Sequence, residues 1–283
     1  MMNREFTQIH TGIDFGEGPR WHDGKLWFSD FYRHGVFTLD AEGTETRVVT
    51  IENQPSGLGW MPDGMLLISS MIDQKVMALS PEGELREHAD LSGVVKDKCN
   101  DLVVTADGTA YVGNFGFALD KGADFESTTL VRVAPDGEVH IAASGLMFPN
   151  GSVITPDNKT LIVGETFGGQ YTAWDIEADG TLTNRRIWAK VDGHVPDGCC
   201  LDTDGAIWMS DVSNNRYCRV HEGGEVSETI EVDGNAVACM LGGDDGRTLF
   251  MLVSPTTHPG KLKGNGLSFI LTTQVEVGAA GRP

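Results

Sequence analysis

The sequence of 283 residues lacks long hydrophobic runs and is poor in positive charge. No apolar segment approaches the roughly 18 residues that a bilayer span requires, so we expect no contact with a membrane. Lys and Arg number 21 against 41 Asp and Glu, which gives a formal net charge of −20. This charge repels nucleic acid and anionic lipid, and it argues against both as partners. The first residues lack the basic flank and apolar stretch of a signal peptide, so we expect a cytoplasmic protein.

Several sequence motifs are also absent. The five cysteines form no CxxC pair and are odd in number, which predicts free, buried thiols at Cys99, Cys199, Cys200, Cys218 and Cys239. The eight histidines show neither HxH nor HExxH spacing, so a His-based zinc site is not expected. No GxSxG motif is present, which argues against a serine-hydrolase elbow. No amphipathic helical stripe of useful length occurs, and this disfavours a helical fold.

A strand-turn-strand pattern recurs six times along the chain. Each copy has an apolar strand, an Asp-Gly or Asp-Asn turn and a second apolar strand, with turns that begin at Asp23, Asp63, Asp107, Asp157, Asp204 and Asp245. Such turns favour β-hairpins because their residues tolerate positive φ. Spacings of 39 to 50 residues between copies are typical of four-stranded propeller blades. We predict an all-β fold, a six-bladed β-propeller of four-stranded blades, with residues 1–283 as a single domain.

Two segments stand outside the repeat. Residues 5–10 precede the first copy and could supply the missing outer strand of the last blade, which would close the ring. Residues 114–128 form the longest departure from the pattern, either as an ordinary insertion or as a substrate lid. We expect the phenylalanines near these turns to pack between blades, with a pocket wall as the alternative; they are Phe115, Phe117, Phe148 and Phe167. Tandem β-sandwiches are the main alternative fold, but they do not explain why the same pattern recurs six times at similar spacing.

One position of the repeat is rich in oxygen-bearing side chains, and we call it the slot. It lies seven residues before each turn, or six in the first copy, and contains Glu17, Ser56, Asn100, Asn150, Asp197 and Ala238. In a propeller these positions begin the inner strands at one end of the channel, so we expect their side chains to converge. Two carboxylates and two amides form an all-oxygen set of the kind that hard cations prefer. A polar, water-filled channel is the alternative.

Further acidic residues share other positions of the repeat. Asp30, Glu165 and Asp211 end the second strand of their copies, in FSD, VGE and MSD. We expect them to bond backbone amides between blades, with a role in the site as the alternative. Asp101 follows Asn100 directly, and we expect it either to face the opposite side of its strand or to orient Asn100.

Four short motifs occur in this order along the chain: FGEGPRW, KCNDL, MFPNGS and VPDGCC. Together they resemble the SMP-30/gluconolactonase family, also called regucalcin-like, over essentially the whole sequence. The resemblance implies a six-bladed propeller with one divalent cation, for which we expect Ca²⁺, with Zn²⁺, Mn²⁺, Mg²⁺ and Fe²⁺ as alternatives. It implies Glu17, Asn150 and Asp197 as ligands and Asn100 as a contact to substrate or metal. Sugar lactonases of the family commonly have Arg two residues before that Asn, where this chain has Lys98.

The resemblance implies metal-dependent hydrolysis of a small-molecule lactone, sugar-derived or of a related hydroxy acid. The cation would act as Lewis acid and Asp197 as general base, while Asn100 and Lys98 would bind the substrate. Two alternatives stay open: a phosphotriesterase-like hydrolase on the same metal site, and a non-catalytic Ca²⁺-binding propeller. The sequence leaves the particular lactone, the native metal and the oligomeric state open.

Overall fold

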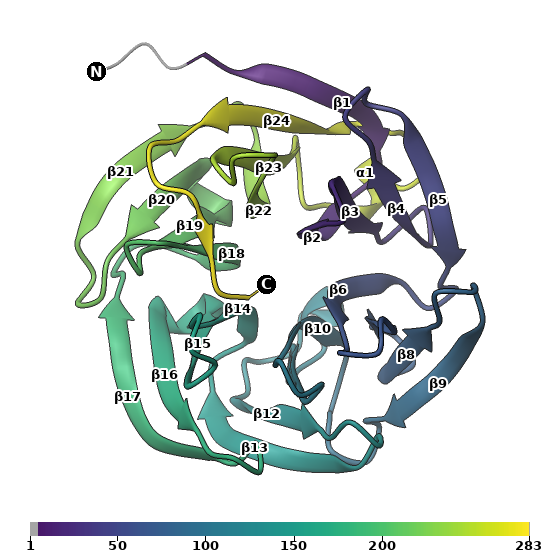
Figure 1. Ribbon diagram of the computed structural model, residues 1–283, viewed down its shortest axis with the longest axis vertical. Helices are drawn as coiled ribbons and strands as arrows, with labels where there is room; N and C mark the ends of the chain where they lie inside the picture. The colour runs from purple at the N-terminus through teal and green to yellow at the C-terminus, as the bar shows by residue number, and fades with distance from the viewer. Residues whose placement is uncertain (1–4, 283) are drawn as a thin grey trace.

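The computed structural model describes residues 5–282, and nearly all its regular elements are β-strands arranged in a ring (Figure 1). Six antiparallel sheets follow one another around a central channel. The blades are formed by β2–β5, β6–β9, β10–β13, β14–β17, β18–β21, and β22–β24 together with β1. The predicted six-bladed propeller of four-stranded blades is therefore confirmed.

Each blade runs from an inner strand at the channel to an outer strand at the rim. The inner strands are β2 (Gly16–His22), β6 (Pro55–Trp60), β10 (Cys99–Val104), β14 (Pro149–Ile154), β18 (Pro196–Asp202) and β22 (Asn235–Gly242). The second strands are β3 (Lys25–Asp30), β7 (Leu66–Ser70), β11 (Ala110–Asn114), β15 (Thr160–Glu165), β19 (Ile207–Asp211) and β23 (Thr248–Ser254). The third strands are β4 (Gly35–Leu39), β8 (Lys75–Leu79), β12 (Thr128–Val133), β16 (Gln170–Ile176), β20 (Arg216–Val220) and β24 (Ser268–Gln274). The outer strands are β5 (Glu45–Thr50), β9 (Leu85–Asp90), β13 (Val139–Leu146), β17 (Leu182–Lys190), β21 (Val226–Glu231) and β1 (Thr7–Ile13).

The core lies between neighbouring blades. In one cluster, Leu67 and Val76 of the second blade pack with Leu102 and Val112 of the third. Inner strands are covered by a neighbouring blade on each face, so nearly all of their side chains are buried, polar ones included. All five cysteines are free and buried in this core, as predicted.

The ring closes within the sixth blade. The N-terminal strand β1 pairs antiparallel with β24, with Thr7 opposite Thr272 and Ile13 opposite Ser268. Figure 1 shows this contact between the first strand in purple and the last long strand in yellow. The sequence prediction of closure is confirmed, and the strand begins and ends slightly later than residues 5–10.

A short C-terminal segment turns inward after β24 and reaches the centre of the ring (Figure 1). There β25 (Ala279–Ala280) pairs with the inner strand β18, and Arg282 forms a bridge with Ile154 of β14. This segment lies outside the six copies of the repeat, so the sequence pattern did not predict its position. The helical elements are α1 (Pro259–Leu262), η1 (Leu119–Lys121), η2 (Thr166–Gly168) and η3 (Val212–Asn214). Within residues 5–282 we find no helix with the length and apolar composition needed to cross a membrane.

Candidate functional site at the channel mouth

A β-bulge interrupts each inner strand at or beside the slot. In β2 the register with β3 shifts between Glu17 and Arg20, and corresponding shifts occur in the other five inner strands. A bulge leaves a residue unpaired and re-aims its side chain. The slot side chains are thereby freed from the regular alternation between the two inter-blade faces and can turn to the channel.

Glycine follows the slot residue in four of the six copies, at Gly18, Gly57, Gly151 and Gly198. A Cβ on Gly18, whose φ is +52°, would lie 2.5 Å from the carbonyl oxygen of Ser56 in the next blade. A Cβ on Gly151 would lie 2.4 Å from the carbonyl oxygen of Asp197. Only glycine allows this approach, so these positions keep the inner strands in contact near the axis and bring their slot residues close together.

The polar slot residues are buried at one end of the channel. Their exposed fractions are 6% for Glu17, 4% for Asn100, 5% for Asn150 and 9% for Asp197. The Nδ2 of Asn150 donates to Asp197 Oδ1 at 2.7 Å, which links the fourth blade to the fifth. The Nδ2 of Asn100 donates to the carbonyl oxygen of Pro149 at 3.4 Å, which links the third blade to the fourth. The repeat phase thus brings these side chains together, as the sequence suggested.

The carboxyl groups in this cluster repel one another. Burial raises the pKa of Glu17 well above its usual range, and the charges of Asp197 and Asp101 raise it further. Burial also raises the pKa of Asp197 to about 7, with a smaller contribution from Asp101. Burial and mutual repulsion thus disfavour the ionised form of both carboxyl groups, and a bound cation would stabilise it.

The donor atoms also fit a hard cation. The amide nitrogens of Asn100 and Asn150 already donate hydrogen bonds, so their amide oxygens are the atoms left to bind a metal. In the second slot the buried hydroxyl of Ser56 has no hydrogen-bond partner among residues 5–282. With the carboxylates of Glu17 and Asp197 the cluster is composed entirely of oxygen donors, which suits Ca²⁺ or Mg²⁺ better than Zn²⁺.

A buried ion pair crosses the channel next to this cluster. Arg20 of β2 places a guanidinium nitrogen 2.7 Å from Asp101 Oδ1, and both side chains are 4% exposed. The same guanidinium donates to the carbonyl oxygens of Pro19, Leu58 and Leu102. Asp101 thus forms an ion pair with a residue of another blade. The sequence had suggested only that Asp101 faces the opposite side of its strand or orients Asn100. The signal for Arg20 was its place in FGEGPRW, where it is the one basic residue and stands three residues after Glu17.

Three acidic residues fix the segments that lead into the slots. Asp30 accepts hydrogen bonds from the backbone amides of Asp14 and Phe15, in the connection between the sixth and first blades. The same arrangement recurs where Glu165 accepts from Met147 and where Asp211 accepts from Val195. Each of these amides precedes a slot residue by two or three positions. The expectation of hydrogen bonds to backbone amides between blades is confirmed. These three carboxylates hold the backbone that leads into the slot residues.

Lys98 contacts the loop 114–128. Its ammonium pairs with Asp120 and lies 5.5 Å from the centroid of the Phe115 ring. A second ion pair joins Lys96 to Glu126. Both pairs fasten the loop to the segment that leads into β10, and its role as an ordinary insertion or as a substrate lid stays a prediction. The assignment of Lys98 to substrate binding stays a prediction.

A second group of potential ligands lies in the fifth blade, where His194, Asp211 and Cys218 offer atoms within 4.8 Å of one another. Hydrogen bonds already account for this group. Asp211 Oδ2 lies 2.8 Å from His194 Nδ1 and accepts from Arg216 Nε, also at 2.8 Å. Burial raises the pKa of the Cys218 thiol, which disfavours the thiolate that a metal needs. The guanidinium would also repel a cation, so we assign these residues a structural role.

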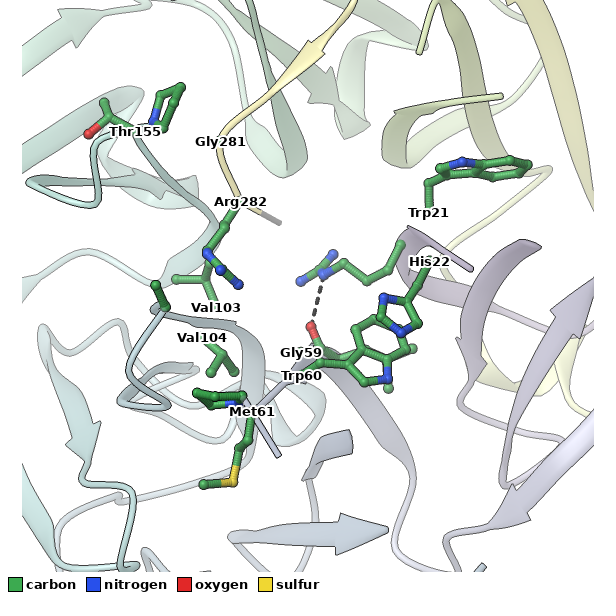
Figure 2. A pocket seen from close by; sticks show the side chains of 15 residues that line it. Trp21, His22, Gly59, Trp60, Met61, Val103, Val104, Thr155, Gly281 and Arg282 are labelled. Carbon is green, nitrogen blue, oxygen red and sulfur yellow. Dashed lines mark hydrogen bonds between the residues drawn. The ribbon is translucent and has the colours of Figure 1, made fainter. Parts of the chain in front are cut away.

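A cavity of about 450 Å³ opens at the other end of the channel. Figure 2 shows Trp21, His22, Trp60 and Arg282 around it, and the His22 ring stacks on Trp60 with centroids 3.9 Å apart. The first three residues end inner strands, whereas the slot residues begin them. This cavity and the acidic cluster therefore lie at opposite ends, with the Arg20 ion pair between them.

The ring of blades and its buried oxygen cluster define a propeller with a candidate cation site in its channel. The chain belongs to the SMP-30/gluconolactonase/LRE-like family, whose model matches residues 15–254. Lactonase drp35 of Staphylococcus epidermidis is 24% identical over 269 residues, which cover 90% of this chain and 76% of drp35. Regucalcin of Danio rerio is 24% identical over 252 residues, which cover 84% of this chain and 82% of that regucalcin. The crystal structure of a calcium-binding regucalcin from Agrobacterium tumefaciens superposes with a TM-score of 0.78 at 21% identity. The superposition covers 99% of this chain and 98% of the regucalcin chain.

Proposed function

We propose that this protein is a metal-dependent lactonase that hydrolyses a sugar-derived or related hydroxy-acid lactone. The observation that carries the proposal is the buried cluster of Glu17, Asn100, Asn150 and Asp197 at one end of the channel. The relative named lactonase supports a lactone as substrate, and the calcium-binding regucalcin supports Ca²⁺ as the cation. Zn²⁺, Mn²⁺, Mg²⁺ and Fe²⁺ are the alternatives to be tested.

Glu17, Asn150 and Asp197 would hold the cation, with Asn100 beside them. When bound, it would supply Lewis-acid polarisation of the ester carbonyl. Asn150 occupies Asp197 Oδ1, so Oδ2 is the atom that accepts a proton from water as the water oxygen bonds to the carbonyl carbon. Asp197 then returns this proton to the ring oxygen as its bond to the carbonyl carbon breaks, which gives the hydroxy acid. Asn100 and Lys98 orient the substrate.

Metal analysis followed by a substrate panel tests this function. We expect one divalent cation per chain, loss of lactone turnover after chelation, and recovery on addition of Ca²⁺ or one of the alternatives. Binding to the native state should also raise the melting temperature. Cleavage of phosphotriesters without lactone turnover would favour the phosphotriesterase-like alternative. Metal binding without turnover of either class would favour the non-catalytic propeller.

A further inference from the structure

Five phenylalanines form a connected cluster over the third and fourth blades. They are Phe115, Phe117, Phe125, Phe148 and Phe167, and the centroids of contacting rings lie 4.5 to 6.2 Å apart. We call this set the phenylalanine cluster. Three of its members, Phe115, Phe117 and Phe125, come from the loop between the second and third strands of the third blade.

The phenylalanine cluster adjoins the proposed site. Phe148 stands two residues before Asn150, and Phe167 follows Thr166, whose hydroxyl accepts a hydrogen bond from Asn150 Nδ2. On the neighbouring blade, the amide of Phe115 donates to the carbonyl oxygen of Lys98, two residues before the third slot. A substrate that approaches the fourth slot from this side therefore passes these rings.

The apolar lining continues around the mouth from Phe115. This ring packs, with Tyr32, against a buried cluster of Phe15, Phe31, Met71, Val237, Ala238 and Leu262. Phe15 stands two residues before Glu17, and Ala238 is the slot residue of the sixth blade. Apolar groups of the first, second, third, fourth and sixth blades thus surround the carboxylates.

Phe148 has a backbone conformation that is costly for a bulky residue. Its φ is +66°, in the left-handed region that non-glycine residues rarely adopt. Its ring lies 4.5 Å from that of Phe115, and its carbonyl oxygen accepts a hydrogen bond from the amide of Thr166. Such conformations persist where the surrounding structure holds them, commonly at ligand sites.

Two members of the phenylalanine cluster are open to solvent. Phe125 is 46% exposed and Phe167 is 49% exposed, and their ring centroids lie 5.8 Å apart. Phe117, which contacts both, is only 7% exposed. An exposed apolar patch beside a buried polar site is typical of a ligand-binding groove. Beside this patch, the ammonium of Lys98 pairs with Asp120 and lies 5.5 Å from the centroid of the Phe115 ring.

We propose that the phenylalanine cluster selects lactones with an alkyl or aryl substituent over polyhydroxylated sugar lactones. This inference rests on the proposed lactonase function and narrows its substrate class. The substituent would be buried against Phe125 and Phe167 while the ester reaches Asp197. A sugar lactone would instead bring its hydroxyl groups out of water onto aromatic rings that cannot replace their hydrogen bonds, which is unfavourable.

Four six-membered lactones test the selectivity: δ-valerolactone, δ-decalactone, dihydrocoumarin and glucono-δ-lactone, each with saturating metal. We expect kcat/KM for the alkyl and aryl lactones to exceed that for glucono-δ-lactone by about tenfold or more. Phe125→Ala and Phe167→Ala should each lower kcat/KM for those two substrates by about three- to tenfold, with little change for δ-valerolactone. Phe6→Ala is the matched control, because Phe6 is 45% exposed but lies beside the outer strand β1.

The outcomes separate this inference from the lactonase proposal. Preference for glucono-δ-lactone, or equal losses on all four substrates, would overturn the selectivity and leave the lactonase function in place. Absence of turnover on the whole panel would refute the lactonase function instead. In that case a thermal-shift comparison of 5-hydroxydecanoate with gluconate decides the ligand class. Stabilisation by 5-hydroxydecanoate that is lost in Phe125→Ala/Phe167→Ala supports the apolar site, and its absence overturns it.

Discussion

Asp197 carries the proposed chemistry at the scale of single residues, because it is both a ligand candidate and the assigned proton acceptor. Replacement by Asn keeps the size and one oxygen but removes the charge and the base. Loss of a general base typically lowers the rate by about 10² to 10⁴. We therefore expect metal-saturated Asp197→Asn to be folded and nearly inactive, as measured by kcat with circular dichroism as a check of folding.

The control for that variant is Asp204→Asn, which alters an acidic side chain of the same blade that is 59% exposed. Its kcat should match that of the wild type. If metal-saturated Asp197→Asn keeps more than about a tenth of the wild-type kcat, less loss than removal of a base causes, the proton acceptor lies elsewhere.

The ion pair of Arg20 and Asp101 makes a different residue-scale prediction, concerning stability. Asp101→Asn leaves a buried guanidinium with carbonyl partners but no counter-charge. Breaking one side of a buried pair costs about 3–5 kcal/mol, so urea unfolding should show a loss of this size with metal saturating. In contrast, Asp204→Asn breaks the exposed pair with Arg219 and should cost less than about 1 kcal/mol.

A double variant, Arg20→Met/Asp101→Leu, removes both buried charges. It should recover much of the stability lost in Asp101→Asn, because apolar replacements of a buried pair are often neutral or better. Equal free energies of unfolding for Asp101→Asn and Asp204→Asn would show that the pair does not stabilise the ring.

At the scale of elements, the sequence predicted that the strands exist and where the hairpins turn. It did not predict the register shifts within the strands. Turns such as Asp63-Gly64 and Asp107-Gly108 fixed where hairpins turn, and glycine at both second positions has positive φ, +87° and +95°. The bulges at the slots could not be predicted, because a register shift depends on how the partner strand pairs. The ion pair of Lys98 with Asp120 was equally hidden, since it joins two segments whose contact follows only from the folded loop.

The N-terminal strand gives an element-scale test of ring closure. A chain that starts at Asp14 would lack β1 and leave the outer edge of β24 unpaired. Unpaired edges favour association of strands between molecules, and Ile13, which is 1% exposed, would be lost from the core. We expect a lower melting temperature and larger particles by light scattering. Thr7→Ala, at an exposed position of β1, should behave like the wild type; equal stability of the truncated chain would show that closure matters little.

At the scale of the whole molecule, the six phases of the repeat determined both the fold and the meeting point of the slot residues. The sequence could place Glu17, Asn150 and Asp197 at one end of the channel because rotation about the ring axis makes equivalent positions neighbours. It could not reveal the C-terminal segment at the centre, since β25 pairs with β18 outside the repeat. Nor could it show the phenylalanine cluster as one surface, because its members come from separate turns.

The clustering of carboxyl groups predicts how metal and pH act together on stability. In the metal-free protein the pKa of Asp197 is about 7, above its value of about 4 in an unfolded chain. The folded state therefore binds more protons between these values, and its free energy of unfolding falls as pH rises from about 4 to about 7. A cation binds the ionised groups, so its stabilising effect should grow over the same range.

Melting temperatures with chelator and with saturating Ca²⁺ measure this effect at pH 5 and pH 8. We expect the gain from Ca²⁺ to be larger at pH 8. The net charge of −20 also weakens the fold as pH rises, so Asp197→Asn is the necessary control. That variant keeps the global repulsion but loses one of the two carboxylates proposed as ligands, and its gain from Ca²⁺ should be smaller and depend less on pH. An equal gain at both pH values in the wild type would show that the cation binds away from these carboxylates.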